Sequence, residues 1–266
     1  MISAALFKRE MKSGWKLLLI FSAVLTMYGV MIVIMFDPKF MDGIDVMIQS
    51  MPGLMALFGM GESASSLTHF ISNYLYGFLL QVFPLVFILI MANRLIARYV
   101  DSGSMAYLLA TPIKRLRLAL TQLLFLCFCI VLLVAYFTLL IILTGEAMFP
   151  GQLEIPQFLL LNLGLLGLLT FYAGLCFFAS AVFNETKKSN AVGAGLTIAF
   201  LLIQMLSNAG DKFSGLKYAT PLTLFDIKGI LAGDPGAVIG FLILYAAGIA
   251  LFIAGTASFI RRDLPI

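Results

Sequence analysis

The chain has 266 residues, of which 62% are hydrophobic and only 11% are charged, whereas soluble domains average about 45–50% and about 25%. This composition excludes a soluble globular protein. The apolar stretches are continuous over about 20 residues or more, which is the length of a membrane-spanning helix and excludes the alternating pattern of a transmembrane β-barrel. We therefore expect an all-α, polytopic membrane protein that forms a single transmembrane domain over residues 1–266.

The N-terminal residues 1–14 have the pattern of an amphipathic helix. Ile2 and Leu6 fall on one helical side, whereas Lys8 and Lys12 lie elsewhere, which predicts an interfacial helix on the membrane surface. The alternative is a basic flank that only sets the topology. The apolar stretch that follows is longer than the core of a signal peptide and lacks a clear cleavage site, so we interpret it as a retained span.

Hydrophobic stretches predict six membrane spans, at residues 15–36, 72–93, 118–143, 157–183, 190–208 and 237–260. When the loops are assigned to alternate sides, 13 of the 17 lysines and arginines fall on the side of both termini. Only Lys39, Lys212, Lys217 and Lys228 fall on the other. The positive-inside rule therefore predicts that both termini are cytoplasmic. The formal net charge of +4 matches contact with anionic lipid headgroups, and no nucleic acid is needed to explain it.

Two segments on the predicted outer side are too long to be simple turns. Residues 37–71 contain an apolar stretch that Pro52 and several glycines interrupt, and residues 209–236 contain another between Pro221 and Pro235. Both are too short and broken to span the bilayer, and we expect external half-helices or re-entrant pieces.

The cytoplasmic loop at residues 94–117 carries the most specific pattern. Gly103 breaks one helix, Ser104 can cap the next, and Pro112 ends it. The short helix predicted between them exposes apolar side chains to the cytoplasm, those of Met105, Tyr107, Leu108 and Leu109. An apolar helix outside the bilayer requires a groove on a partner protein.

This loop resembles the signature of the type-two ATP-binding-cassette (ABC) exporter permeases. The matching residues are Asp101, Gly103, Ser104, Leu108, Leu109, Ala110, Thr111, Pro112 and Arg115. The similarity extends over nearly the whole chain, including the six spans and the N-terminal amphipathic helix. The chain departs from the family pattern at Met105, where many members have an acid, and at Asp101, where many have glutamate.

The resemblance implies a coupling mechanism in a bacterial plasma membrane. The helix of this loop would dock in a groove of a separate ATPase subunit, and Asn184, Glu185 and Thr186 in the second cytoplasmic loop, residues 184–189, would make a further contact. Two permease copies, identical or closely related, would assemble over two ATPases. The chain contains no G-x-x-x-x-G-K-[ST] motif, so ATP and Mg²⁺ would bind the partner, and this chain would be a permease without catalytic residues.

Two polar stripes within the spans are candidates for a substrate pathway. In the fifth span Asn190, Thr197, Gln204 and Asn208 lie within about 40° of one another on a helical projection. In the second span Asn73, Gly77 and Gln81 share a side. The resemblance implies that these two spans line the seam between the two permeases. Alternatively, these side chains bond neighbouring helices or cap span ends.

Neither stripe is charged, which favours an amphipathic or hydrophobic substrate over a sugar or a small ion. The chain also resembles exporters of phenol-soluble modulins and antimicrobial peptides, so amphipathic cytolytic peptides are the preferred substrate. The alternatives are export of a drug, lipid or ion, or a peptide-binding immunity protein that transports nothing.

Other classes of membrane protein are disfavoured by what the spans lack. An ion-coupled transporter needs acids inside its spans, and the predicted spans carry none away from their ends. The three cysteines lie in apolar runs without metal-ligand spacing, and neither these nor the single histidine suggests a metal or another cofactor in this chain. A nucleophile and base arrangement for an intramembrane hydrolase is also missing.

Overall fold

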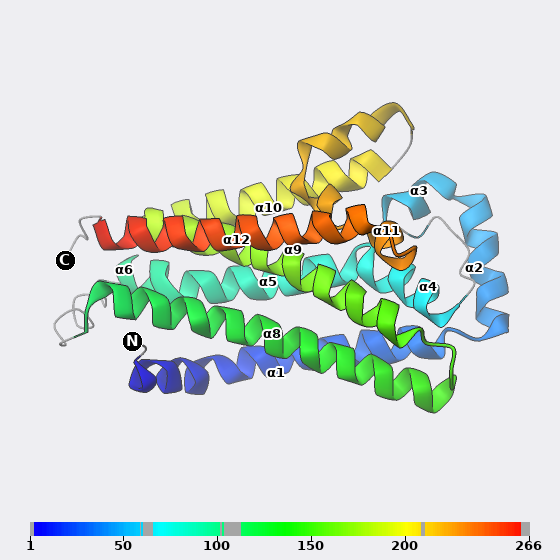
Figure 1. The fold of residues 1–266 in the computed structure, drawn as a ribbon, viewed down its shortest axis with the longest axis horizontal. Helices are drawn as coiled ribbons and strands as arrows, with labels where there is room; N and C mark the ends of the chain where they lie inside the picture. The colour runs from blue at the N-terminus through cyan, green and yellow to red at the C-terminus, as the bar shows by residue number, and fades with distance from the viewer. Residues whose placement is uncertain are drawn as a thin grey trace.

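A computed structural model describes residues 3–58, 60, 66–101, 103, 113–208 and 211–261. The long helices run side by side along the molecule, and the chain termini lie at the same end of the bundle (Figure 1). We call this the termini end and the opposite one the far end. The elements are α1 (Ala4–Ile34), α2 (Pro38–Ser50), α3 (Pro52–Leu57), α4 (Leu67–Ile71), η1 (Ser72–Tyr76), α5 (Leu79–Ala92), η2 (Asn93–Ala97), α6 (Arg98–Asp101), α8 (Arg115–Met148), α9 (Ile155–Val182), α10 (Thr186–Asn208), η3 (Asp211–Ala219), η4 (Pro221–Leu224), α11 (Ile227–Leu231) and α12 (Pro235–Arg261).

Six of these helical segments are long and apolar enough to cross a membrane. They are α1, the segment Leu79–Asp101, α8, α9, α10 and α12. The expectation of an all-helical fold is therefore confirmed for the described residues, and the six long apolar helices are candidate membrane spans. The third to sixth spans contain almost all of the predicted stretches and extend beyond them by up to five residues, because polar and basic residues at the ends continue the helical hydrogen bonding outside the apolar stretch.

The first helix differs from the expected interfacial helix at 1–14. Instead, Ala4–Ile34 is one continuous helix of 31 residues, about 46 Å long at 1.5 Å per residue. The reason is packing: Leu6, Glu10 and Gly14 are buried at helical spacing, and a Cβ at Gly14 would lie 3.1 Å from Phe125 of α8. Leu6, on the apolar face that would suit a membrane surface, is instead covered by the protein itself.

The second span is a composite helix rather than a regular one. It runs from α4 through the π-helix η1, breaks at Gly77 and Phe78, and continues as α5, the π-helix η2 and α6. Gln81 Nε2 donates to the Tyr76 carbonyl oxygen at 3.0 Å. This bond gives a backbone carbonyl at the break a hydrogen-bond partner. Gly103, at φ +69°, follows α6 and turns the chain, a conformation that glycine adopts without strain.

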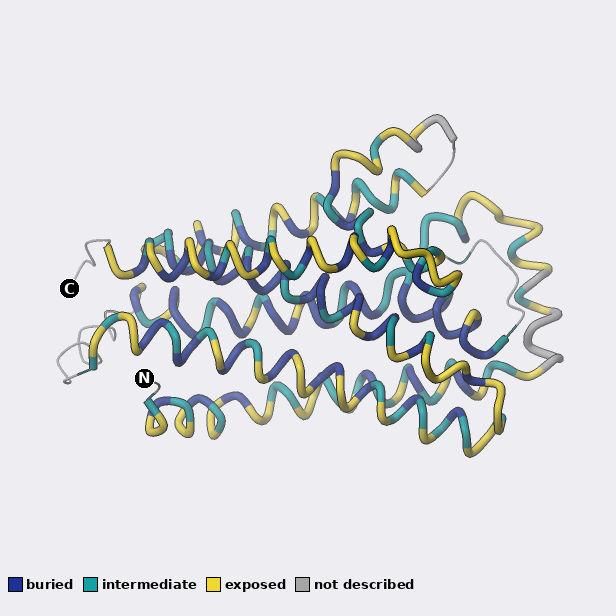
Figure 2. The backbone as a smooth tube through the Cα atoms, viewed as in Figure 1, coloured by how far each residue is buried: buried dark blue, intermediate teal, exposed yellow. Residues whose placement is uncertain are grey.

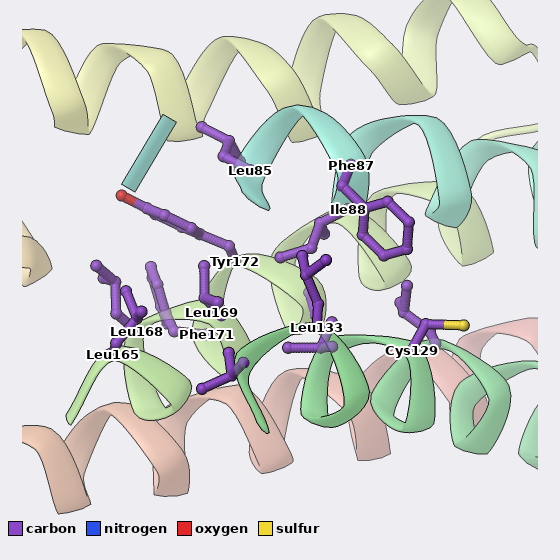
Figure 3. Close-up of a cluster of buried hydrophobic side chains, with 14 of the residues drawn as sticks. Leu85, Phe87, Ile88, Cys129, Leu133, Leu165, Leu168, Leu169, Phe171 and Tyr172 are labelled. Carbon is purple, nitrogen blue, oxygen red and sulfur yellow. The ribbon is translucent and has the colours of Figure 1, made fainter. Parts of the chain in front are cut away.

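The core of the bundle lies between α5, α8 and α9. Leu165, Leu168 and Tyr172 of α9 belong to the same cluster of buried side chains as Leu85 and Ile88 of α5 and Leu133 of α8 (Figure 3). Helix α9 is the most enclosed span, since 72% of its apolar window is buried, against 22% for α10. Exposed residues recur along the outward sides of the other long helices (Figure 2). Those outward sides carry large apolar side chains such as Leu202 and Ile253, as expected for contact with lipid.

Short helices cover the far end. Helix α2 lies across the ends of the long helices (Figure 1). The expected half-helix at 209–236 is divided, within the described residues, into η3, η4 and α11. Pro221 starts η4 and Pro235 starts α12, because a proline lacks the N–H that would continue a preceding helix. Leu222, Phe225 and Ile230 of this segment are buried against the bundle.

Candidate functional site

A cavity of about 580 Å³ opens at the far end between the second and fifth spans. Five of the seven predicted pathway residues line it: Asn73, Gly77, Gln81, Gln204 and Asn208. They come together because the break at Gly77 and Phe78 and the last turns of α10 lie at the same depth of the bundle. Two stripes that are about 120 residues apart in sequence thus form facing walls of one space.

The segment between α10 and α12 completes the cavity. Thr223 of η4 donates from Oγ1 to Gln204 Oε1 at 3.1 Å, and Gln204 Nε2 lies 3.5 Å from Asn208 Oδ1. Thr223 Oγ1 also lies within hydrogen-bond distance of the Lys217 carbonyl oxygen, so its single hydroxyl proton has two possible acceptors. Apolar walls are added mainly by Phe78, Leu201, Met205, Leu222 and Phe225. The cavity is therefore amphipathic: amide and hydroxyl groups converge on it between aromatic and aliphatic surfaces.

Sequence reasoning missed several residues that line this cavity. These residues all belong to the far-end segment between α10 and α12, and they are Lys217, Thr223, Asp226 and Lys228. The helices of this segment are too short to show a hydrophobic period in the sequence. The one available signal was the apolar stretch between Pro221 and Pro235, which indicated packing against the bundle but not which side chains face the cavity. The three charged residues also mean that the site is not wholly uncharged, as the stripes alone suggested.

Asn190 and Thr197, the other two predicted pathway residues, lie away from the cavity. Thr197 is buried, and its hydroxyl donates to the Gly193 carbonyl oxygen at 2.8 Å within α10. Asn190 accepts a hydrogen bond from Asn93 of η2, whose Oδ1 accepts from Ser189 at 3.2 Å. For these two residues the geometry is that of bonds within or between helices, the alternative that the sequence left open.

The predicted coupling residues are partly described. Asp101 ends α6 and is exposed, and Asn184 and Glu185 are exposed in the short turn before Thr186 begins α10. Glu185 pairs with Lys188 at 2.7 Å. Both turns lie at the termini end (Figure 1). The remaining predicted coupling residues lie outside the described part of the chain: Ser104, Met105, Tyr107, Leu108, Leu109 and Pro112.

A buried acid joins three helices close to these turns. Glu10 of α1 is only 2% exposed, and its Oε1 accepts hydrogen bonds from the Tyr99 hydroxyl at 2.9 Å and from Gln122 Nε2 at 3.2 Å. The Arg9 guanidinium carbon lies 5.7 Å from the centroid of the Tyr99 ring. We call Glu10, Tyr99 and Gln122 the Glu10 cluster. The sequence pattern does not reveal it, because residues 1–14 have the pattern of a surface helix, on which Glu10 would be exposed.

Comparison with known proteins provides one match. The family model described as "ABC-2 family transporter protein" matches residues 7–264, which is nearly the whole chain and includes the far-end cavity and the turns at the termini end. No curated protein and no solved structure matches the chain.

Proposed function

Because the chain belongs to the ABC-2 family of transporter proteins, and is a membrane permease without an ATPase site, we propose that it is the membrane subunit of an ATP-driven exporter. In this proposal a separate cytoplasmic ABC ATPase binds ATP and Mg²⁺, and the permease converts nucleotide-driven movement into opening and closing of a path through the membrane. ABC-2 permeases generally pair with an ATPase subunit. The energetic requirement is that the ATPase contacts the permease differently in its two nucleotide states.

The exposed turns at the termini end support the ATPase contact. Asp101 and the turn of Asn184 and Glu185 leave the bundle on the same side, so one partner can reach both. The Glu10 cluster links α6, which leads into the coupling loop, to α1 and α8. A force applied at the loop would therefore reach three helices.

Two permease copies side by side complete the proposed transporter. Helix α10 is the span that most needs a neighbour besides lipid, because its apolar window is only 22% buried and it also carries the exposed polar residues Asn190 and Asn208. Polar groups that face hydrocarbon are costly, whereas a seam between two copies can hydrogen-bond them. A homodimer or a pairing with a closely related chain would place two cavities beside one seam.

The proposed substrate class rests on the amphipathic lining of the far-end cavity. Its converging amide groups can hydrogen-bond a peptide backbone, while Phe78, Met205 and Phe225 offer apolar contacts. An amphipathic peptide with cytolytic or antimicrobial activity presents both kinds of group. With cytoplasmic termini in a bacterial plasma membrane, as the distribution of lysine and arginine predicts, the cavity faces outward and would hold substrate before its release.

The decisive experiment measures stimulation of ATP hydrolysis. The permease, purified as a complex with its ATPase, is reconstituted in liposomes and supplied with amphipathic peptides, drugs or lipids. We expect peptides to stimulate hydrolysis most strongly. Gln204→Leu, which removes the hydrogen bonds to Thr223 and Asn208, is expected to raise the peptide concentration for half-maximal stimulation by roughly tenfold.

The matched control is Gln157→Leu, because Gln157 lies in the first turn of α9 and does not line the cavity. It should respond to peptides as the unaltered complex does. Equal responses of Gln204→Leu and the unaltered complex would remove the cavity from the pathway. Stimulation by drugs or lipids but not by peptides would overturn the substrate class and leave the permease assignment in place.

A further inference from the structure

A second cavity of about 500 Å³ lies at the termini end, between the second and fifth spans. One part of its wall is apolar and consists of Val86, Leu89 and Ile90 of α5 with Ala194 of α10. The other part carries Arg94 and Arg98. We call this cavity the arginine groove. The predicted coupling residue Thr186 also lines it, but an ATPase contact does not account for an apolar wall beside two arginines.

The groove is apolar toward the middle of the bundle and cationic toward the termini end. The acyl chain and the phosphate of a phospholipid are arranged in the same order. Val86 and Ile90 are exposed apolar side chains in the bundle's outer surface, and Asn93, Arg94 and Arg98 follow toward the termini end. Arg98 follows Val86 by twelve residues, which corresponds to about 18 Å along a helix at 1.5 Å per residue. One leaflet of the hydrocarbon core is about 15 Å deep, so the length of the groove matches the distance from the middle of a bilayer to its lipid phosphates.

The electrostatics of the groove favour an anion. Among the described residues that line it, both charged side chains are arginines and none is an acid. The acid nearest in sequence to its α10 wall, Glu185, is paired with Lys188 at 2.7 Å. Arg94 donates from one terminal nitrogen to the carbonyl and hydroxyl oxygens of Ser13, which holds the guanidinium in place. A guanidinium has five N–H donors, so others stay available for a phosphate.

We propose that the arginine groove binds one anionic glycerophospholipid. Its acyl chain packs against Val86, Leu89 and Ile90, and its phosphate diester accepts hydrogen bonds from Arg94 and Arg98. The proposal is independent of the transported substrate and of the partner ATPase. A phosphate here also neutralises the like charges that two permease copies would bring together along a seam of α5 and α10.

The test measures lipid binding to the full-length permease by native mass spectrometry from detergent. Dioleoylphosphatidylglycerol is titrated against dioleoylphosphatidylcholine, which has the same chains and a zwitterionic headgroup, and against inorganic phosphate. We expect one phosphatidylglycerol to bind roughly tenfold more tightly than phosphatidylcholine, because the charged pair favours the anion. Inorganic phosphate at millimolar concentration should displace little of it, because the acyl chain supplies much of the affinity.

Three variants locate the site. Arg98→Gln removes one cation and should weaken phosphatidylglycerol binding roughly tenfold. Ala194→Phe fills the apolar part and should weaken both lipids without changing the charge. The matched control is Arg117→Gln: Arg117 is exposed at the termini end but does not line the groove, and its variant should bind as the unaltered protein does.

Three results would each overturn the proposal. Equal affinities for the two lipids would show that no anion site exists. The same loss in Arg117→Gln and Arg98→Gln would show diffuse attraction to the basic side of the protein. Full displacement by inorganic phosphate, together with unchanged binding in Ala194→Phe, would show an anion site without a lipid chain.

Discussion

Buried polar side chains decide how these helices are held together at the termini end. In an apolar bundle an unpaired polar group costs far more than an ordinary hydrogen bond contributes. Glu10 meets this requirement through Tyr99 and Gln122, and Ser180 through Ser189 and the Ala92 carbonyl oxygen. These links join helices that are distant in sequence, and they lie beside the turns that the ATPase is proposed to contact.

Removing the acid of the Glu10 cluster should loosen the termini end. Glu10→Ala leaves the Tyr99 hydroxyl and Gln122 Nε2 without their acceptor, at a cost of about 1–3 kcal/mol. We expect a clear fall in the midpoint of thermal unfolding, measured in detergent by the labelling of the buried cysteines. Glu10→Gln keeps an acceptor oxygen and should lower the midpoint less.

The control for this change is Glu185→Ala, which removes an exposed carboxylate paired with Lys188. Exposed pairs contribute about 0–1 kcal/mol, so its midpoint should stay close to that of the unaltered protein. If both variants unfold at the same temperature, the cluster does not hold the helices together.

At the scale of the helix, α9 and α12 make a close contact that depends on small residues. A Cβ at Gly174 would lie 2.6 Å from the Gly248 carbonyl oxygen, and a Cβ at Gly248 would lie 2.7 Å from the Thr170 carbonyl oxygen. Backbone therefore packs directly on backbone, as in other membrane helices that pair through small residues. This contact anchors α12 to the enclosed helix α9 and leaves α10 as the less buried neighbour.

Gly248→Ala tests this contact, because the higher helix propensity of alanine and its steric clash with α9 change the stability in opposite directions. Alanine in a helix interior is favoured over glycine by about 1 kcal/mol, but the clash with α9 backbone can be relieved only by separating the two helices, at about 1–3 kcal/mol. We expect a net fall in the thermal midpoint. Gly195→Ala in α10 meets nothing within 4 Å and should be neutral or stabilising; a rise in both variants would refute the close contact.

The coupling loop carries a prediction that rests on its sequence. Leu108→Asp combined with Leu109→Asp should abolish stimulation of the partner's ATPase and export, because charged side chains would not enter an apolar groove. Membrane insertion and the thermal midpoint should stay unchanged. The double variant with isoleucine at both positions keeps the apolar surface and serves as the control. Normal export by the aspartate variant would rule out this loop as the coupling element.

For the whole molecule, the distribution of charge predicts orientation. Lysines and arginines gather at the termini end, as the positive-inside rule requires of a cytoplasmic side. Single cysteines introduced by Lys187→Cys and Lys39→Cys, in a chain whose native cysteines are replaced by alanine, should react with an impermeant maleimide from opposite sides. Tyr218→Cys, at a side chain that is 82% exposed at the far end, should behave as Lys39→Cys does.

Labelling in intact cells followed by permeabilised cells distinguishes the two orientations. We expect Lys39→Cys and Tyr218→Cys to react in intact cells, and Lys187→Cys only after permeabilisation. The reverse order would show that the protein has the opposite orientation in the membrane, with the far-end cavity on the cytoplasmic side. The permease assignment would survive, but the proposed direction of export would not.

Composition and hydrophobic pattern were enough to predict the class of protein and the six apolar stretches, whereas the family was indicated only by the resemblance of the loop at residues 94–117 to a known signature. These features are local, because a stretch of about 20 apolar residues is driven into a helix in lipid wherever it occurs. The same reasoning predicted Asn73, Gln81, Gln204 and Asn208 as polar positions, since a helical period places side chains on one face. It could not tell which of these faces meet across the bundle.

Tertiary packing decided the rest. Glu10 is buried, α1 is continuous, Thr223 reaches Gln204, and Asn190 bonds Asn93 instead of lining the far-end cavity. Each of these depends on a contact between residues far apart in the chain, and on breaks such as Gly77 and Phe78 that shift the register of one helix against another. A one-dimensional pattern contains the period of each helix, but not its rotation or depth relative to its neighbours, and those two quantities determine every site described above.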